Sequence, residues 1–329
     1  MNNKVIIFHS EIPPDAPADE LDVLDEAEFF RKELVLLGYY PVVMPFTFNM
    51  NDSISLVKEM QPDFVVNLVE TAGGTGRLVH LAPDIFDVLR VNYTGSPAEA
   101  IYLTSNKIVS KKLMAFAGIP TPRFIAPGQI HNLPKNDGTR YIIKSLWEHA
   151  SVGLDEHTMK LLTSVDEIAA ELLLRKNRGE LCFAEEFIDG REFNISMLGR
   201  KDGFNVLPQA EIRFDGYTDE MLKIVGYRSK WDESSYEYHH SNRSFDFTPA
   251  DEPLLAELRK ICGDCWNAFN LKGYVRVDFR IDAAGKPYVL EINANPCISP
   301  DSGFVAAASR AGLSGAEVIS RIIDDMNVF

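Results

Sequence analysis

The sequence predicts an α/β protein that begins with a parallel sheet wound with helices and continues into further domains. Short apolar stretches alternate with helical stretches along the N-terminal part of the chain, which is the pattern of a parallel sheet. The chain has 329 residues, too many for one typical hydrophobic core, so we expect two or three domains. An apolar fraction of 46% with 25% charged residues is that of a soluble globular protein.

The first domain is expected to end near Gly95-Ser-Pro97. Residues 4–8, 41–45 and 64–69 are short and apolar, and each predicts a strand. Residues 19–37 and 52–60 predict the helices between them. The run from Gly73 to Gly76 lacks the Lys-Ser/Thr ending of a P-loop and the full glycine spacing of a dinucleotide site, so we interpret it as a flexible turn.

The middle of the chain carries lysines in and at the ends of its predicted elements. A helix over residues 104–118 contains Lys107 and the pair Lys111-Lys112, and a charge run of this kind predicts a solvated face. A strand over residues 141–144 ends in Lys144, and the small-residue loop at 151–153 can bring backbone N–H groups near a phosphate. Three further stretches have strand character: residues 123–126, residues 182–193 with a tight turn at Asp189-Gly190, and residues 223–228.

The most informative stretch is a predicted hairpin, in which residues 273–281 and 288–296 flank a turn with Gly285 and Pro287. Strand side chains alternate between faces, so Arg276, Asp278 and Arg280 share one face of the first strand, and Glu291 and Asn293 share one face of the second. Two carboxylates, a carboxamide oxygen and a nearby arginine suit Mg²⁺ carrying phosphates. The alternative is an ordinary hairpin with surface ion pairs, Arg276–Asp278 and Arg280–Glu291.

Charge and cysteine content exclude several classes of function. The net charge of −15 argues against nucleic acid and against an anionic membrane surface as partners. No apolar run reaches the length of a membrane span and no secretory pattern opens the chain, so cytoplasm is the expected location. Cys262 and Cys265 recur on the apolar face of a helix over residues 255–269, which favours core packing over zinc or redox chemistry. The helix over residues 314–326 has a similar core face.

The order of these pieces resembles that of ATP-grasp enzymes, in particular their D-alanine–D-alanine ligase branch. Lys107, Lys144, the loop at 151–153, the Glu185–Ile188 segment and the hairpin follow one another as in those ligases. Tyr93-Thr-Gly-Ser96 and Gly118-Ile-Pro-Thr-Pro122 add to the likeness, which covers nearly all of the chain from about residue 64. The resemblance implies an ATP-grasp fold with an N-terminal substrate domain over 1–98, a central lid subdomain over 99–184 and a catalytic subdomain over 185–329.

The resemblance also implies roles for individual residues. The lysines would neutralise the ATP phosphates, the loop at 151–153 would close over them, residues 185–188 would hold the adenine, and Glu192 would bind the ribose. The residues implied for ATP are Lys107, Lys144, Ser151, Val152, Gly153, Glu185, Glu186, Phe187, Ile188, Glu192 and Lys230. Asp278, Glu291 and Asn293 would bind two Mg²⁺ ions, with Mn²⁺ as a substitute. Arg276 and the backbone N–H of Cys297 would stabilise an oxyanion, and Ser302 would hold the carboxylate of the acceptor.

The implied reaction joins two amino acids or a small peptide in an amide bond. ATP activates a carboxylate as an acyl phosphate, which the amine of the second substrate attacks. The resemblance further implies a homodimer.

Departures from the family pattern fall mainly on the pocket of the first substrate. The glutamate that recognises the first amino group has no direct equivalent, and we expect Glu11, Asp19 or Glu20 to replace it. Asn67-Leu-Val-Glu70 stands in place of a His-Gly segment, and Trp231 and Cys297 replace a tyrosine and a glycine. We therefore expect retained activation chemistry with a changed substrate. Genuine D-alanine–D-alanine ligation, a kinase acting on a hydroxyl, and an ATP-binding regulator without ligase activity remain the alternatives.

Overall fold

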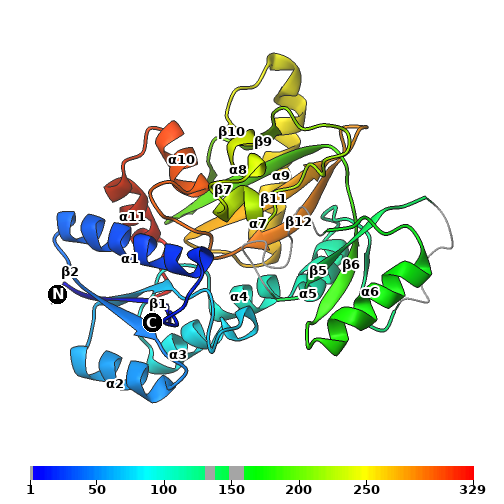
Figure 1. The fold of residues 1–329 in the computed structure, drawn as a ribbon. Helices are drawn as coiled ribbons and strands as arrows, with labels where there is room; N and C mark the ends of the chain where they lie inside the picture. The colour runs from blue at the N-terminus through cyan, green and yellow to red at the C-terminus, as the bar shows by residue number, and fades with distance from the viewer. Residues whose placement is uncertain (1–2, 130–137, 148–158) are drawn as a thin grey trace.

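The computed structural model describes residues 3–129, 138–147 and 159–329 and shows the α/β architecture that the sequence predicts (Figure 1). Within the described residues, the strands form three sheets, and the two that follow the N-terminal sheet are built from antiparallel pairs. No helix of the described residues combines the length and the low polarity needed to cross a bilayer.

The N-terminal sheet is parallel and has the strand order β2-β1-β3. Its elements in chain order are β1 (Lys4–Ser10), α1 (Ala18–Leu36), β2 (Tyr40–Phe46), α2 (Met50–Met60), β3 (Phe64–Leu68), the short 3₁₀ helix at Gly76–Leu78 and α3 (Leu81–Leu89). Val5 and Ile7 on β1 pack in one apolar cluster with α1, whereas Ile6 and Phe8 pack in another with Phe86 of α3. Helices therefore cover both faces, which confirms the doubly wound sheet.

The central part is a small antiparallel sheet of order β4-β6-β5. Its elements are α4 (Ala98–Ser105), α5 (Lys107–Phe116), β4 (Phe124–Ile125), β5 (Tyr141–Ser145), α6 (Val165–Asn177) and β6 (Cys182–Glu186). Ile168 of α6 packs on Tyr141 and Ile143 of β5 to form the core of this sheet.

The C-terminal part is a sheet of order β10-β9-β7-β11-β12, with β8 paired to β7. Its elements are β7 (Arg191–Arg200), β8 (Gly203–Val206), β9 (Ala210–Phe214), α7 (Tyr227–Trp231), α8 (Tyr236–His240), β10 (Ser241–Ser244), a 3₁₀ turn (Pro249–Asp251), α9 (Glu252–Ala268), β11 (Tyr274–Ile281), β12 (Pro287–Asn293), α10 (Gly303–Arg310) and α11 (Gly315–Asp324). Cys262 and Cys265 are fully buried between α9 and this sheet, which confirms their core role. Burial raises the pKa of both thiols. Val318, Ile319, Ile322 and Ile323 of α11 are buried as predicted.

Three predicted elements differ in the structure. The helix over 104–118 is two helices, because the Asn106 side chain accepts hydrogen bonds from the backbone N–H groups of Ile108 and Val109 at 3.1 Å and starts α5 afresh. The prediction of a strand over 223–228 is wrong, because this stretch is irregular until α7 begins at Tyr227. The stretch 182–193 is two strands, β6 and β7, joined through the predicted turn.

Gly190 in that turn has φ +146°, and a Cβ there would lie 1.9 Å from the carbonyl oxygen of Ile281. Only glycine allows β7 to start this close to β11. The turn therefore brings Glu192 opposite Arg280 in the sheet.

Candidate active site

The hairpin of β11 and β12 forms as predicted and sets the register of its polar residues. Arg276 lies opposite Asn293 and Asp278 opposite Glu291, and a bulge follows Asp278. The four side chains therefore gather at one end of the hairpin. The three oxygen donors among them, Asp278, Glu291 and Asn293, are of the kind that Mg²⁺ prefers, so this group of side chains fits a magnesium site.

Arg276 and Asp278 form a bidentate pair, with Nε–Oδ1 at 2.7 Å and Nη2–Oδ2 at 2.9 Å. The Asp278 side chain is 9% exposed and also accepts a hydrogen bond from Asn194 Nδ2 at 2.9 Å. Burial opposes charge on Arg276, but Asp278 raises the pKa of the guanidinium. Arg276 and Asp278 therefore form a buried ion pair with a fixed orientation. The alternative interpretation, in which they form a surface ion pair, is wrong.

Arg280 does not pair with Glu291. Its Nη2 lies 3.0 Å from Glu192 Oε2, and both side chains are less than a tenth exposed, at 4% and 8%. Arg280 also donates to the carbonyl oxygens of Gly190 and Lys223. Burial raises the pKa of Glu192, an effect that Arg280 opposes. The second surface pair of the alternative interpretation is therefore absent, and Arg280 instead fixes the side chain predicted to bind ribose.

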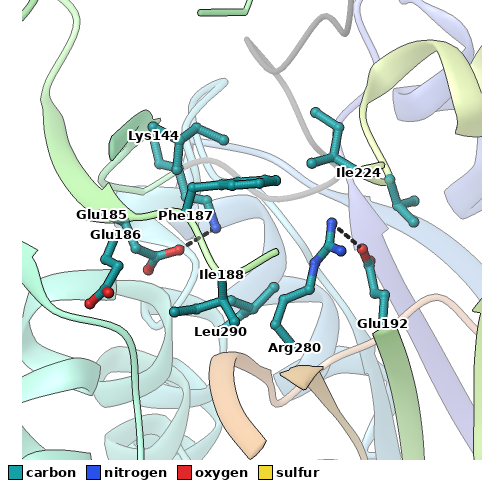
Figure 2. Close-up of a pocket in the computed structure, with 11 residues that line it drawn as sticks. Lys144, Glu185, Glu186, Phe187, Ile188, Glu192, Ile224, Arg280 and Leu290 are labelled. Atoms are coloured by element: carbon teal, nitrogen blue, oxygen red, sulfur yellow. Dashed lines mark hydrogen bonds and ion pairs between the residues drawn. The ribbon is translucent and has the colours of Figure 1, made fainter. Parts of the chain in front are cut away.

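Figure 2 shows the pocket to which these residues belong, a space of roughly 440 Å³ between the two antiparallel sheets. It brings together six residues of the predicted ATP set: Lys144, Glu185, Glu186, Phe187, Ile188 and Glu192. Five lining residues were not singled out from the sequence as ATP contacts: Ile142, Ile224, Val225, Arg280 and Leu290. The lining is apolar in the middle and charged at both ends, which suits a flat aromatic ring that carries polar groups.

Backbone hydrogen bonds limit how residues 185–188 can hold an adenine. The N–H of Glu186 donates to the carbonyl of Arg123 and the N–H of Phe187 to that of Arg140, both at 2.8 Å. Those two donors are therefore used by the protein itself. The Phe187 ring has the Arg140 guanidinium 5.2 Å from its centroid and that of Arg280 at 5.8 Å.

The predicted lysines point toward carboxylates of the site. Lys144 Nζ lies 2.5 Å from Glu185 Oε1, and Lys107 Nζ lies 3.6 Å from Glu291 Oε2. Lys230 lies on α7, where burial and the neighbouring Arg276 lower its pKa. Ser151, Val152 and Gly153 lie outside the described residues.

Lys111 contradicts the prediction of a solvated face, because its side chain is only 1% exposed and forms an ion pair with Glu185. Its neighbour Lys112 is exposed as predicted. Charge runs of this length carry no signal that separates the two positions. The structure distinguishes them: Lys111 contacts Glu185, Thr121 and Leu290, whereas Lys112 is exposed.

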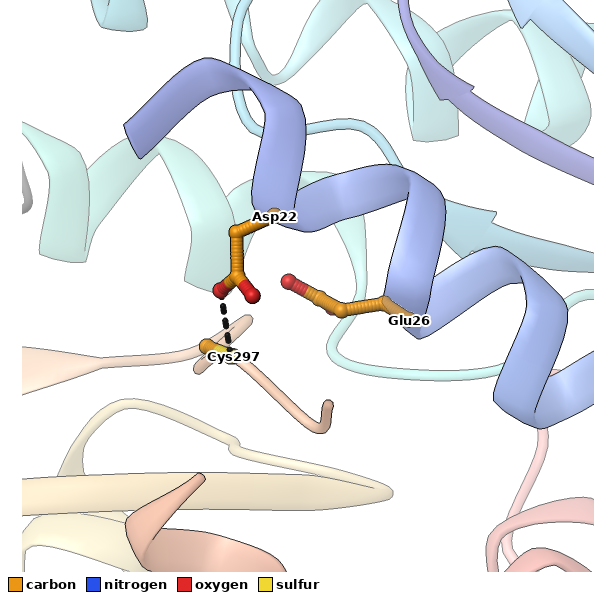
Figure 3. Close-up of side chains that lie close together, drawn as sticks. All are labelled: Asp22, Glu26 and Cys297. Atoms are coloured by element: carbon orange, nitrogen blue, oxygen red, sulfur yellow. Dashed lines mark hydrogen bonds between the residues drawn. The ribbon is translucent and has the colours of Figure 1, made fainter. Parts of the chain in front are cut away.

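Two acidic side chains of α1, Asp22 and Glu26, lie beside Cys297, as Figure 3 shows. The Cys297 thiol donates to Asp22 Oδ2 at 2.9 Å, and polar atoms of Asp22, Glu26 and Cys297 all lie within 4.8 Å of one another. Glu26 is 2% exposed, and burial together with Glu70 and Asp22 raises its pKa well above the usual range. Burial, together with Glu26 and Asp22, raises the pKa of the Cys297 thiol.

Of the acids expected to replace the family's glutamate, Glu11 and Glu20 are exposed, and Asp19 accepts a hydrogen bond from Tyr227 at 3.2 Å. The acids nearest Cys297 are Asp22 and Glu26 instead. Their spacing of four on a helix, beside the apolar positions Val23 and Ala27, is a signal that could have identified them.

Glu70 is a further acid near the hairpin. Burial and the nearby Asp22 raise its pKa to about 7, although Arg276 opposes this. It lines a small cavity together with Asn293 and Asn295. The segment Asn67–Glu70, noted as a departure from the family pattern, therefore reaches the site.

Ser302 is the N-cap of α10 and accepts a hydrogen bond from the N–H of Val305 at 3.2 Å. Arg243 lies beside this helix end, with Nη2 3.3 Å from the position of a Cβ on Gly303. A helix N-terminus and a guanidinium both favour the binding of an anion. Arg243 was not predicted, because the short strand that carries it, β10, offers no motif.

Comparison with known proteins agrees with this geometry. Residues 130–324 match the family described as D-ala D-ala ligase C-terminus. An uncharacterized protein of Sinorhizobium fredii, y4sG, is 31% identical over 82% of this chain and 78% of its own length. A D-alanine--D-alanine ligase of Bordetella pertussis is 30% identical over 72% of this chain and 71% of its own length.

The fold is also that of solved ligases. The D-alanine--D-alanine ligase of Bacillus anthracis complexed with ATP superimposes with a TM-score of 0.73 at 19% identity, covering 98% of this chain and 96% of that one. From the matched family, the relatives and the shared fold, the chain belongs to the D-alanine–D-alanine ligase family of ATP-grasp ligases.

Proposed function

We propose that this protein is an ATP-dependent carboxylate–amine ligase that acts through an acyl phosphate on a first substrate other than D-alanine. The observation that carries the proposal is the hairpin constellation of Arg276, Asp278, Glu291 and Asn293 beside a pocket that suits a nucleotide. An ATP-binding regulator would need the pocket, but it would not need an arginine oriented for an oxyanion.

In the first step a substrate carboxylate oxygen attacks the γ-phosphorus of ATP, and the bond to ADP breaks. Mg²⁺ held by Asp278, Glu291 and Asn293 would offset the charge of the transferred group. Lys107, Lys144 and Lys230 would supply further positive charge to the phosphates. Ser151, Val152 and Gly153 would close over them and exclude water, which would otherwise hydrolyse the acyl phosphate.

In the second step the amine of the acceptor attacks the acyl carbon, phosphate leaves and an amide forms. Asp278 binds the Nε and Nη2 edge of Arg276, so the guanidinium can offer its remaining N–H groups to the tetrahedral oxyanion. The backbone N–H of Cys297 would be the second donor. Each such donor is typically worth about 3 kcal/mol of transition-state stabilisation. Ser302 would hold the carboxylate of the acceptor, and Arg243 beside it would add charge.

The change of first substrate is supported by the replaced positions at the site, Cys297 and the segment Asn67–Glu70, and the acids near them indicate which group that substrate carries. Asp22 and Glu26 lie beside the replaced position Cys297, and Glu70 lies near Arg276; acidic groups of this kind favour a cationic amine, which D-alanine shares with other amino acids. We therefore propose an amino acid or peptide with an ammonium group as the first substrate.

Genuine D-alanine–D-alanine ligation is the second candidate, and the similarity to ligases of that name over about 70% of the chain favours it. A screen of ATP- and Mg²⁺-dependent phosphate release over L and D amino-acid pairs separates the two. Release with D-alanine alone, with the dipeptide mass, establishes the second candidate. Release with another pair, with hydroxylamine trapping the acyl phosphate, establishes the first. Transfer of phosphate to a hydroxyl without amide formation would overturn both.

A further inference from the structure

We propose that Lys111 is a positioning residue of the ATP site, whose buried charge neutralises Glu185 and so leaves the charge of Lys144 available to the nucleotide phosphates. This inference depends on one part of the proposed function, namely that the pocket of Figure 2 binds ATP.

Lys111 is held in place by its partners, and although burial lowers the pKa of its ammonium, the Glu185 carboxylate opposes that shift. Its Nζ donates to Thr121 Oγ1 at 3.0 Å and to the carbonyl oxygen of Leu290 at 3.2 Å, and it forms an ion pair with Glu185 Oε2. Of the three N–H groups of the ammonium, two are used in these hydrogen bonds, and the ion pair with Glu185 adds a third fixed partner. Thr121 is itself fixed, because its hydroxyl donates to the carbonyl of Val289 at 2.9 Å.

These partners come from both antiparallel sheets. Glu185 lies on β6 of the central sheet, and Leu290 lies on β12 of the C-terminal sheet, next to the predicted metal ligand Glu291. Lys111 therefore ties the two walls of the pocket together from behind. It lines no part of the pocket itself, so it acts through its neighbours.

Glu185 is shared between two lysines. Its Oε1 lies 2.5 Å from Lys144 Nζ, while Oε2 contacts Lys111, and the carboxylate is 1% exposed. Burial acts to raise the pKa of Glu185, but Lys111 and Lys144 together lower it. The carboxylate is therefore ionised, and the three groups carry one net positive charge.

The balance of charge gives Lys111 its role. Without Lys111, the Glu185 carboxylate and the Lys144 ammonium would form a neutral pair, and the phosphates would meet no net charge there. With Lys111 in place, one positive charge remains for the phosphates. Because Lys144 is 15% exposed and Lys111 is 1% exposed, the available charge is presented by Lys144.

The test measures binding of ATP and of adenosine by titration calorimetry, in Mg²⁺ buffer without amino acids. Lys111→Met should weaken ATP binding by about tenfold to a hundredfold, the worth of a hydrogen bond to a charged group, and adenosine binding by less than about threefold. Lys112→Met is the matched control, since that lysine is exposed on the same helix, and it should change neither. The double variant Lys111→Met/Glu185→Gln restores one net charge and should recover ATP binding to within about threefold of the original protein.

Equal loss of ATP and adenosine binding in Lys111→Met would mean that the residue only holds the fold, and would overturn the proposal. Failure of the double variant to recover ATP binding would overturn it as well. If Lys111→Met does not fold, the double variant compared with the original protein still decides the question. Failure of the original protein to bind ATP would instead refute the proposed function.

Discussion

The buried ion pair between Arg280 and Glu192 gives a prediction that needs no knowledge of the substrates. The two side chains are 4% and 8% exposed, and their charged atoms lie 3.0 Å apart. Arg280→Met keeps the length of the side chain but leaves the Glu192 carboxylate without its counter-charge. Removing one partner of a buried pair typically costs about 3–5 kcal/mol, so we expect a loss of that size in the free energy of unfolding at pH 8.

The pH dependence of this loss follows from the carboxyl group. Burial already raises the pKa of Glu192 in the folded protein, and removing Arg280 raises it further. A carboxyl group whose pKa is higher in the folded than in the unfolded protein lowers the free energy of unfolding at any pH above its unfolded-state pKa. At such a pH the folded protein must either bury a charge or keep the group protonated. Below the unfolded pKa the group is neutral in both states. The loss caused by Arg280→Met should therefore shrink as the pH falls from 8 toward 4.

The assay is urea unfolding followed by tryptophan fluorescence at pH 4, 6 and 8. Arg259→Met is the matched control: this arginine pairs with Glu252 at the surface, where its side chain is 39% exposed, and its loss should cost less than about 1 kcal/mol. A loss below about 1 kcal/mol for Arg280→Met, or a loss that does not depend on pH, would refute the reasoning.

Three further predictions concern the reaction, measured with the amino-acid pair that gives the fastest phosphate release. Arg276→Lys keeps the charge but loses the forked geometry, so kcat should fall about 10²–10³-fold while ATP affinity stays within about threefold; an unchanged kcat would contradict the oxyanion role. Glu291→Gln should lower phosphate release at least about a hundredfold and raise the Mg²⁺ concentration needed for half activity, whereas an unchanged Mg²⁺ titration would exclude Glu291 as a ligand. Because the pKa of Glu70 is raised to about 7, its ionised fraction rises about tenfold between pH 6 and pH 8, so the affinity for an ammonium-bearing first substrate should rise by a similar factor. In Glu70→Gln that rise should disappear, and its persistence would assign it to another group.

Much of the fold could be predicted from the sequence because local patterns determine it. Apolar runs and helical periodicity identified β1, α1, β2, α2 and β3, and the strand–turn–strand pattern identified the β11–β12 hairpin. The strand period of two placed Arg276 with Asp278 and Glu291 with Asn293, and the structure sets these pairs opposite each other. Where the pattern was ambiguous, as at residues 223–228, a short mixed segment gave no period long enough to distinguish strand from irregular chain.

The sequence by itself thus determined the elements and the hairpin, since period and spacing are local properties of the chain, and the resemblance to the ligases supplied the expected roles of the site residues. Only the tertiary structure decided which charges are buried and what they face. Lys111 and Lys112 are neighbouring residues of the same type. The Lys111 side chain is nevertheless 1% exposed and pairs with Glu185, whereas Lys112 faces solvent. Asp22 and Glu26 meet Cys297 across 271 or more residues of chain because α1 packs beside the C-terminal part. Burial and pairing between distant segments depend on the packing of whole elements, and no local pattern encodes that packing.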